Sequence, residues 1–588
     1  MRKLILGAAI AALAAAPAVV IGNGAAAEQT AGAQDAGEQE YVVVYTEGVS
    51  LDAARDAVAA AGGTIVNENT DVGVATVVTN NADFVAAASA QDALMGTAQN
   101  RVIGAAPDLV AGTGEGKKFD PAEADLATVA GAPTHGNRPG RPAPNAEPLA
   151  DLQWDMAQIG ATVDGSYRFE KGSSGVRVGI LDTGVDGTHP DIAPNFHARL
   201  SRNFTVDIPV DANGANIDGP CAAEPDQSCE DASDVDENGH GTHVASTIAS
   251  PMNGIGIAGV APKATIVNLR AGQDSGYFFL QPSVDALTYA GNSGIDVVNM
   301  SYYVDPWLFN CSSHPADSPE DRAEQQAIVE AMQRALDFAY EHGVTLVAAA
   351  GNGATDYTKI ISDASSPDFA DTPGEAPYVR DLLDPATCIS MPSEGDGVIS
   401  VSSTGISTRK AYYSDYGNGY VDIAAPGGDV YDTPDNTRDI TKAVLAAYPE
   451  SLARARGQLD PSGNPNTPNV VKSCDTAGTC AYYQYLQGTS MASPHTAGVA
   501  ALIVSKYGER DHNTGGLGMA PGDVEAILRS TATDTPCPVP PAFTYTRHVP
   551  VAGGGTVTVT ATHVCEGDPA ANGFYGDGII NATKAVGH

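Results

Sequence analysis

The chain has 588 residues, of which 43% are hydrophobic, and its 31 Lys and Arg residues against 71 Asp and Glu residues give a net charge of −40. This hydrophobic content excludes a disordered chain, and the length predicts more than one globular unit. The negative charge repels phosphate backbones and anionic lipids, which excludes nucleic acid as a partner and suits the solvated surface of an exported protein.

The N-terminus has the layout of an export signal. Arg2 and Lys3 precede an apolar run over 4–21, and small residues at 25–27 form a cleavage site. We therefore predict a signal peptide over 1–27, a secreted, extracellular protein, and no membrane attachment after its removal. An uncleaved membrane anchor is the alternative.

Eight cysteines on an exported chain predict disulfides. The sequence does not decide among the roughly 100 possible pairings. Short loops close most easily, which favours Cys221 with Cys229 and Cys474 with Cys480. Elimination then leaves Cys537 with Cys565 and Cys311 with Cys388. None of the cysteines has C-x-x-C spacing, so a thiolate zinc site is not expected.

Residues 28–108 predict a small α+β unit. Its expected elements are a strand at 40–46, a helix at 51–62, a strand at 72–79, a helix at 82–90 and the run 102–108. The stretch 109–150 is rich in Pro, Gly and Ala, and it predicts a linker.

Residues 151–588 predict an α/β domain. Near-continuous apolar runs, typical of strands buried on both faces, lie at 176–182, 264–270, 295–301, 344–350, 397–403 and 420–425. Helical patterns lie between several of them, most clearly at 319–343. We expect a doubly wound, mostly parallel sheet with helices on both faces, and ligands at the carboxyl ends of its strands. Three segments resemble insertions of unknown role, at 205–238, 428–480 and 537–565.

Four motifs place polar residues at the ends of these elements. They are D-T-G with Asp182, H-G-T-H with His240, A-A-G-N with Asn352, and G-T-S-M-A-S-P-H with Ser490. Alone, each has an ordinary structural meaning as a turn residue, a structural histidine or a helix cap. An aspartic protease needs a second D-T-G, and a zinc protease needs H-E-x-x-H; the sequence contains neither.

Together, in this order, the four motifs resemble the subtilisin family over residues 151–586. The resemblance implies that Ser490 is the nucleophile, His240 its base and Asp182 the residue that orients the base. Asn352 and the Ser490 N–H would hold the oxyanion. The implied activity is that of a serine endopeptidase that forms an acyl-enzyme with peptide or protein substrates.

The resemblance also implies a proenzyme. The unit at 28–108 is similar to the ferredoxin-like inhibitory prodomains of the family, with the maturation cut within 109–150. An unrelated small domain is the alternative. We expect the chain's own prodomain to be its intramolecular inhibitor, and the enzyme to be a monomer.

Substrate-binding segments are implied as well. They are an edge from Gly272 to Gly276 that pairs with an extended peptide, one pocket wall at Ser301, Tyr302 and Tyr303, and the opposite wall at Ala349, Ala350 and Gly351. The family usually has Ser-Leu-Gly at the first wall. A tyrosine at the glycine position adds bulk there, so the preferred substrate residue is not indicated.

A structural calcium ion (Ca²⁺) is also implied, because Asp191 and the loop at 251–257 resemble the tight calcium loop of the family. The implied ligands are the side chains of Asp191 and Asn253 and the carbonyls of Pro251, Ile255 and Ile257. The ligand that usually comes from the N-terminus, a Gln, has no clear counterpart near Asp151.

Two other function classes stay open. A catalytically silent binding protein of this fold is expected to have lost at least one of the four motif residues, and all four are present. A dedicated maturation enzyme and a broad scavenging protease are not separated by the sequence. His243 and His495, which accompany the motifs, are expected to be structural.

Overall fold

The structure, a computed structural model, describes residues 39–99, 147–209, 217–225, 227–304, 306–363, 380–511, 515–551 and 554–587. The predicted signal peptide, nearly all of the predicted linker and the run 102–108 lie outside the described residues, as do parts of the first predicted insertion.

The N-terminal unit is a four-stranded antiparallel sheet with two helices. Its elements are β1 (Gln39–Tyr45), α1 (Leu51–Ala60), β2 (Thr64–Asn69), β3 (Val74–Thr79), α2 (Phe84–Ser89) and β4 (Leu94–Gln99). The strand order β2-β3-β1-β4 is that of a ferredoxin-like fold, as predicted. Neither β2 nor β4 was predicted, because their sequences, TIVNEN and LMGTAQ, lack a sustained apolar pattern.

Alternate residues of β1 face two different cores. Val43 packs with α1 and α2, whereas Val42 and Val44 belong to a cluster that contains Ala327 and Ala331 of a later helix, α7 (Pro319–Glu341). This period of two is the ordinary geometry of a strand. One face of the N-terminal sheet therefore packs on the rest of the chain.

The central sheet of the larger domain has seven strands, and all its pairings are parallel. In spatial order they are β15 (Ile423–Pro426), β14 (Val398–Thr404), β10 (Thr345–Ala349), β8 (Val297–Met300), β5 (Arg177–Leu181), β7 (Thr265–Arg270) and β6 (Arg202–Asn203). Each of the six apolar runs became one strand, which confirms the predicted parallel sheet.

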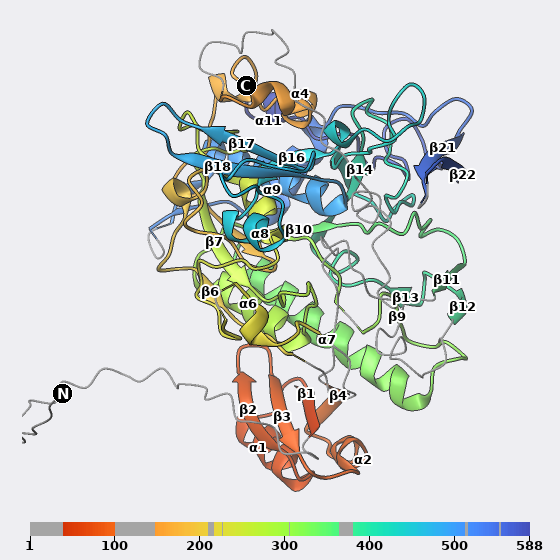
Figure 1. The fold of residues 1–588 in the computed structure, drawn as a ribbon. Helices are drawn as coiled ribbons and strands as arrows, with labels where there is room; N and C mark the ends of the chain where they lie inside the picture. The colour runs from red at the N-terminus through yellow and green to blue at the C-terminus, as the bar shows by residue number, and fades with distance from the viewer. Residues whose placement is uncertain are drawn as a thin grey trace, which may run out of the picture. The chain divides into compact units, whose positions relative to one another are not determined.

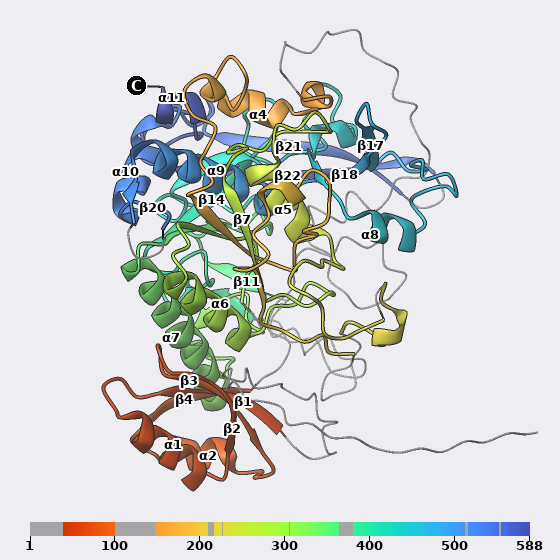
Figure 2. The same ribbon diagram turned by 90° about the vertical axis from the view of Figure 1, so that its left-hand side faces the viewer.

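Helices cover both faces of this sheet (Figures 1 and 2). Besides α7 they are α4 (Trp154–Ile159), α5 (His240–Ala249), α6 (Leu280–Asn292), α9 (Thr489–Tyr507), α10 (Pro521–Thr531) and α11 (Ala582–Val586). The core on one face joins Val297 and Val347 to α5 and α9, and the core on the other joins Val298 and Leu346 to α6 and α7. Consecutive strand residues thus enter opposite cores, which is why these strands are apolar throughout.

The insertions form small sheets of their own. They contain β16 (Val444–Ala447), α8 (Glu450–Ala455), β17 (Val470–Cys474) and β18 (Cys480–Leu486), and the hairpin β21 (Ala542–Pro550) with β22 (Thr556–Val564). Shorter strands are β9 (Asn310–Cys311), β11 (Ile361–Asp363), β12 (Arg380–Leu383), β13 (Cys388–Ile389), β19 (Glu509–Arg510) and β20 (Leu517–Gly518).

All four predicted disulfides are present. They are Cys221–Cys229, Cys311–Cys388, Cys474–Cys480 and Cys537–Cys565. Two of them, Cys474–Cys480 and Cys311–Cys388, join residues that are also paired across antiparallel strands. Each disulfide therefore staples a segment that lies outside the seven-stranded sheet.

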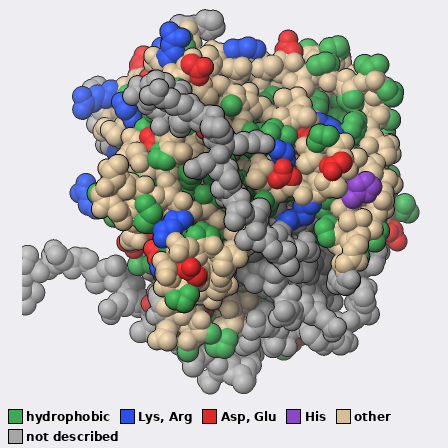
Figure 3. Space-filling model, turned by 45° about the horizontal axis from the view of Figure 1, so that its top comes forward, with side chains coloured by type: hydrophobic (Ala, Val, Ile, Leu, Met, Phe, Trp, Pro, Cys, Tyr) green, Lys and Arg blue, Asp and Glu red, His purple; other side chains and the backbone are tan. Residues whose placement is uncertain are grey.

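The surface carries charges of both signs. On the face drawn in Figure 3, acidic and basic side chains are interspersed among polar and apolar ones. No helix within the described residues is long and apolar enough to cross a bilayer.

Candidate active site

The carboxyl ends of β5, β8 and β10 lie next to one another at one edge of the sheet. Leu181 pairs with Met300, and Met300 pairs with Ala348. The segments that follow these three strands carry Asp182, Ser301 and Asn352, so parallel pairing alone brings three of the predicted site segments together.

Asp182 is fully buried directly after β5. Its backbone carbonyl accepts hydrogen bonds from Ala271 N (3.1 Å) and Gly272 N (3.2 Å), which tie the turn to the end of β7. Its Oδ1 atom accepts from Thr183 N at 2.8 Å. The Asp182 backbone is thus fixed to the end of β7, and the Thr183 N–H contacts its carboxylate.

His240 is the first residue of α5, and its Nδ1 atom lies 2.7 Å from Asp182 Oδ1. Both side chains are completely buried. An ionised carboxylate only accepts hydrogen bonds, so this contact places the ring proton on Nδ1 and leaves Nε2 as the basic nitrogen. The structure therefore brings the predicted base and its orienting residue together.

A buried carboxylate, Asp236, fixes the start of α5 against the Asp182 turn. Its Oδ1 atom accepts from Gly239 N (2.8 Å) and from the Thr183 hydroxyl (3.2 Å), and its Oδ2 atom accepts from Thr242 N at 2.9 Å. Burial raises the pKa of Asp236. The sequence did not predict this role for Asp236, although a carboxylate shortly before a helix start is a capping signal.

The approach of the two segments is close enough to require glycine. A Cβ atom on Gly241 would lie 2.1 Å from the carbonyl oxygen of Gly184. Such a contact is far inside van der Waals distance, so the H-G-T-H glycine is needed for packing rather than for chemistry.

Ser490 lies in the first turn of α9 and is 2% exposed. Its hydroxyl donates to Ser301 O at 3.3 Å, and its carbonyl accepts from the Ser301 hydroxyl at 3.0 Å. The first turn of α9 is therefore joined to the end of β8. Helices α5 and α9 also pack against each other in one core, which puts His240 and Ser490 on neighbouring helices.

Asn352 orders the other side of the same turn. Its Oδ1 atom accepts from Thr489 N (2.8 Å) and from the Thr489 hydroxyl (2.9 Å). A Cβ atom placed on Gly488 would lie 3.6 Å from both Asn352 Nδ2 and Ser490 N. These two donors therefore flank one point beside Ser490.

The residues predicted to form the pocket walls lie at the ends of β8 and β10. Tyr302 is buried and stacks on Phe278, with ring centroids 4.0 Å apart, so its ring belongs to the core. Tyr303 is half-buried. Gly272 forms an antiparallel bridge with Phe278, which makes the predicted substrate edge part of a short hairpin.

The opposite wall has a carboxylate behind it that the sequence did not reveal. Ala349 and Ala350 are buried, and a Cβ atom on Gly351 would lie 2.3 Å from Asp415 Oδ2. Asp415 accepts from Thr355 N at 2.6 Å. Glycine at position 351 is thus required by the Asp415 side chain.

The two other motif histidines make structural contacts. Burial lowers the pKa of His243 to about 3, and its Nε2 atom lies 3.2 Å from Val444 O and 3.1 Å from Gln484 O. His495 lies between Met491 O and Asp155 Oδ2, at 2.7 and 3.0 Å. Both rings thus contact backbone carbonyls or Asp155, as expected for structural histidines.

The predicted calcium residues also lie together. Asp191 is completely buried, and its Oδ2 atom accepts from Ile257 N (3.2 Å) and from the Tyr483 hydroxyl (3.0 Å). Asn253 Oδ1 accepts from Ile255 N at 3.0 Å, which shapes the loop that begins at Pro251. Burial raises the pKa of Asp191 to about 8.

A second acidic residue at this loop was missed in the sequence. Glu147 is buried, and its Oε2 atom accepts from Gly254 N at 2.7 Å. Leu149 N donates to Gly256 O at 2.8 Å. Glu147 therefore brings a carboxylate to the loop for which the sequence indicated no N-terminal ligand. Because over a hundred residues separate Glu147 from the loop, only the fold could show this contact.

Comparison with known proteins decides the family. Residues 173–578, well over half of the chain, match the Subtilase family. The chain belongs to the subtilase family of serine proteases. This subtilase is 28% identical over 344 residues to a thermophilic serine proteinase of Bacillus sp. (strain AK1), covering 58% of this chain and 55% of that protein. It is 27% identical over 332 residues to subtilisin DY of Bacillus licheniformis, covering 56% of this chain and 77% of that protein.

The fold of the subtilase also matches solved structures. The epidermin leader peptide processing serine protease (EpiP) of Staphylococcus aureus aligns with a TM-score of 0.58 and 19% identity, covering 93% of this chain and 98% of that one. At this identity the match shows the fold alone. It extends over almost all of the chain and so includes the small N-terminal sheet.

Proposed function

We propose that this subtilase is a secreted serine endopeptidase that cleaves peptide bonds through Asp182, His240 and Ser490. The observation that carries the proposal is the buried 2.7 Å contact between His240 and Asp182 at the sheet edge to which Ser490 is also joined. Structural histidines are common, but a fully buried His–Asp pair on a helix that packs against the helix carrying the serine is suited to nucleophilic catalysis.

In the proposed reaction His240 Nε2 takes the proton of the Ser490 hydroxyl while the oxygen attacks the substrate carbonyl. Asp182 stabilises the imidazolium that forms, and His240 then gives the proton to the leaving amine. The acyl-enzyme is hydrolysed by the same steps with water as the nucleophile. Burial of the Asp182–His240 pair strengthens the interaction, because the local dielectric is low.

Asn352 Nδ2 and Ser490 N would hold the oxyanion. Both nitrogen atoms lie 3.6 Å from the point where a Cβ atom on Gly488 would stand, so the two donors are close to each other. Two hydrogen bonds from Thr489 fix the Asn352 carbonyl and so orient the whole amide group. Donors fixed in advance cost no reorganisation when charge develops on the carbonyl oxygen.

We further propose that the N-terminal unit is the inhibitory prodomain of this enzyme. Asn69 donates to Asp285 of α6 at 2.7 Å, and Arg334 of α7 donates to Tyr45 O at 2.8 Å. Together with the apolar contacts of Val42 and Val44, these bonds support a docked domain rather than an independent one. Maturation would then require a cut between residues 99 and 147.

The residues around Asp191 fit a calcium ion. Asp191 Oδ1 is buried, and no described residue donates a hydrogen bond to it, so an oxygen ligand is available. Asn253, Glu147 and the loop carbonyls supply further oxygens, the donor type that hard cations prefer. We propose that calcium binds here and stabilises the folded enzyme.

A phosphonylating serine probe tests the proposed nucleophile. The wild type should be labelled once, at Ser490, and peptide mapping by mass spectrometry should show no label in Ser490→Ala. The His240→Ala variant should react far more slowly, because the base is missing. The matched control is Ser530→Ala, which changes an exposed serine that bonds only its own helix. Unchanged labelling of Ser490→Ala would remove Ser490 from its role.

A further inference from the structure

A cavity lies where the hairpin of β21 and β22 meets the loops that follow β14 and β15. It encloses about 230 Å³, and its lining includes Arg409, Tyr412 and Asp429 from the loops and Tyr545 and Arg547 from β21. Cavities that hold whole cofactors or drug-sized molecules are larger, at about 300–1,000 Å³. This cavity is therefore suited to a single side chain or a small molecule.

The cavity lies at the same edge of the central sheet as the proposed catalytic residues. Arg409 follows β14, and Asp429 follows β15. Beyond β10 the sheet continues with these two strands, whereas the predicted substrate edge at Gly272–Gly276 follows β7 on the other side. The ends of β5 and β10, with Asp182 and Asn352, therefore lie between the cavity and the predicted edge.

The wall of the cavity is hydrogen-bonded to the segment that leads into α9. The Tyr412 hydroxyl accepts from Gln487 Nε2 at 3.2 Å, and Gly427 O accepts from Gly488 N at 3.0 Å. Gln487 precedes Ser490 by three residues. The cavity is therefore adjacent to the segment that carries the proposed nucleophile.

Aromatic rings hold the two guanidinium groups of the cavity in place. Arg547 Cζ lies 4.0 Å from the centroid of the Tyr412 ring, and Arg409 Cζ lies 4.9 Å from that of the Phe543 ring. A cation over the face of a ring is attracted by the ring. These contacts also fix the planar donor groups in advance, which lowers the entropy lost when a ligand binds.

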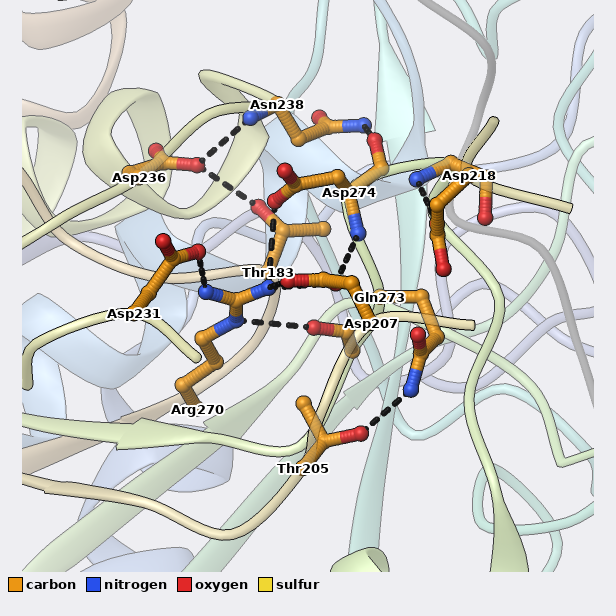
Figure 4. Close-up of polar contacts among 12 residues, drawn as sticks. Thr183, Thr205, Asp207, Asp218, Asp231, Asp236, Asn238, Arg270, Gln273 and Asp274 are labelled. Atoms are coloured by element: carbon orange, nitrogen blue, oxygen red, sulfur yellow. Dashed lines mark hydrogen bonds and ion pairs between the residues drawn. The ribbon is translucent and has the colours of Figure 1, made fainter. Parts of the chain in front are cut away.

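Arg270 shows how this fold satisfies an arginine that is paired internally. Its side chain is completely buried, and its guanidinium donates to Asp207, Asp231 and Asp274 (Figure 4). Arg409 differs, because 26% of its side chain is exposed and its Nε atom has no acceptor among the described residues. The donors of Arg409 are therefore not all used within the fold.

The two carboxylates beside Arg409 accept hydrogen bonds from the backbone. Arg409 Nη2 lies 3.2 Å from Asp432 Oδ1 and 3.7 Å from Asp429 Oδ2. Asp429 Oδ1 accepts from Tyr431 N at 2.9 Å, and Asp432 Oδ2 accepts from Ser407 N at 2.8 Å. The guanidinium therefore attracts both carboxylates without forming the bidentate pair that would saturate it.

Neutral donors line the cavity as well. The Asn436 side-chain amide and the Thr546 hydroxyl both line it, and neither makes a hydrogen bond with another described residue. An amide NH₂ group and a hydroxyl group can each donate to an anionic oxygen. Charged and neutral donors from three segments of the chain thus line one cavity, which is the arrangement of a binding site for an anion.

We infer that this cavity binds a carboxylate of the substrate, carried by an acidic residue that follows the scissile bond. The inference rests on the proposed peptidase function, with the Gly272–Gly276 edge holding the residues before that bond. The part of the substrate after the bond then extends toward β14 and β15. Because the chain has a net charge of −40, an acidic segment is held only where cations are concentrated, as they are at Arg409 and Arg547.

Binding is tested on the exported full chain carrying Ser490→Ala, so the result does not depend on cleavage. The probes are acetyl-Gly-Glu-Gly-amide and its Gln counterpart, titrated by ligand-observed NMR. The Glu probe should bind at least about tenfold more tightly, because its hydrogen bonds are charge-assisted. This comparison needs no substitution in the cavity. Arg409→Gln and Arg547→Gln should each remove the difference, whereas the control Arg510→Gln, an exposed arginine of β19, should keep it.

Cleavage tests the place of the cavity along the substrate. Peptides of one sequence carry a single Glu or Gln at each position on either side of the scissile bond, and kcat/KM is measured with the secreted wild type. Glu at one position after the bond should raise kcat/KM about tenfold, and Glu before the bond should not. Arg547→Gln should remove the gain and leave kcat/KM for the Gln peptides unchanged.

The inference is overturned if the two probes bind the Ser490→Ala chain equally, or if the cleaved peptides show no preference for Glu after the bond. The second result would leave the proposed function intact. A wild type that cleaves none of the peptides would instead refute the proposed function, on which the inference rests.

Discussion

Single side chains at the sheet edge are held by neighbours that take no part in the proposed chemistry. Asp236 and Thr183 fix the approach of α5, Thr489 turns the Asn352 amide, and Ser301 anchors the first turn of α9. Preorganisation of this kind keeps reacting groups in place before substrate arrives.

The Asn352→Ala variant should fold normally and lose turnover. In the proposed mechanism the Asn352 amide stabilises the negative charge that appears on the substrate carbonyl oxygen in the transition state. In subtilisin itself the loss of one such donor lowers kcat about 10²- to 10³-fold, and we adopt that size rather than derive it. Steady-state kinetics should show the loss in kcat with KM nearly unchanged. Asn466→Ala, an exposed asparagine, is the control. Normal kcat in Asn352→Ala would exclude the residue from the oxyanion site.

Lys410 predicts a pH dependence of stability. Burial lowers its pKa to about 7, and its ammonium lies 4.6 Å from the Tyr416 ring centroid. Between about pH 7 and pH 10 the unfolded chain keeps the proton that the folded chain has lost. Stability should therefore rise with pH over this window, by on the order of 1 kcal/mol per pH unit.

Denaturant unfolding at several pH values tests this effect. Lys410→Met should remove the rise between pH 7 and pH 10, whereas Lys506→Met, at the half-exposed end of α9, should retain it. Identical slopes for the Lys410→Met variant and the wild type would show that Lys410 does not titrate in this range.

At the scale of elements, the start of α5 depends on one carboxylate. Asp236→Ala should lower the free energy of unfolding by about 2 to 4 kcal/mol, because several buried donors lose their acceptor. It should also lower kcat, since His240 loses its fixed position relative to Asp182. Asp234→Ala, two residues earlier and partly exposed, should change neither quantity much. Equal kcat in both variants would contradict a positioning role for Asp236.

The loop at 251–257 should respond to calcium. An ion that binds only the folded state stabilises it by about 3 kcal/mol at a concentration near 100 times its Kd. Excess chelator should therefore lower the melting temperature of the wild type. Asp191→Asn should melt lower without chelator and should respond less to it. Chelator that leaves the melting of both proteins unchanged would mean that this loop holds no ion.

At the scale of the whole molecule, the N-terminal unit and the protease domain are two parts of one chain. Contacts of β1 and β2 with α6 and α7 keep the unit docked, and the connecting segment keeps it at high local concentration. The first maturation cut is therefore expected within the molecule, before any second molecule is met.

Ser490→Ala should be exported as a proform that keeps the N-terminal unit, because the nucleophile for that cut is missing. The alanine is small enough for the buried first turn of α9, so the fold should persist. Intact mass of the secreted proteins measures the outcome, and active enzyme added to the variant shows that the cut site is accessible. Processing of the variant at the wild-type site, in a host without other extracellular proteases, would mean that another enzyme activates this subtilase.

The sequence by itself determined the parallel sheet and the neighbourhood of Asp182 and His240, and it favoured the two short disulfide loops, Cys221–Cys229 and Cys474–Cys480. Each rests on a signal that is local in the chain: an apolar run, a motif at the end of an element, or a short loop between cysteines. The carboxyl ends of the strands lie at one edge in any parallel sheet, so the residues that follow β5, β8 and β10 necessarily lie close together.

Only the tertiary structure decided the features that join distant segments. β2 and β4 exist because their neighbours supply hydrogen bonds that their own sequences do not predict. The Tyr302 ring lies in the core because Phe278 stacks on it. Glu147 contacts the loop at 251–257 although it lies 107 residues before Gly254 in the chain. The cavity beside Arg409 likewise combines the loops after β14 and β15 with β21. Contacts of this kind depend on packing between residues far apart in the chain, and no local pattern records them.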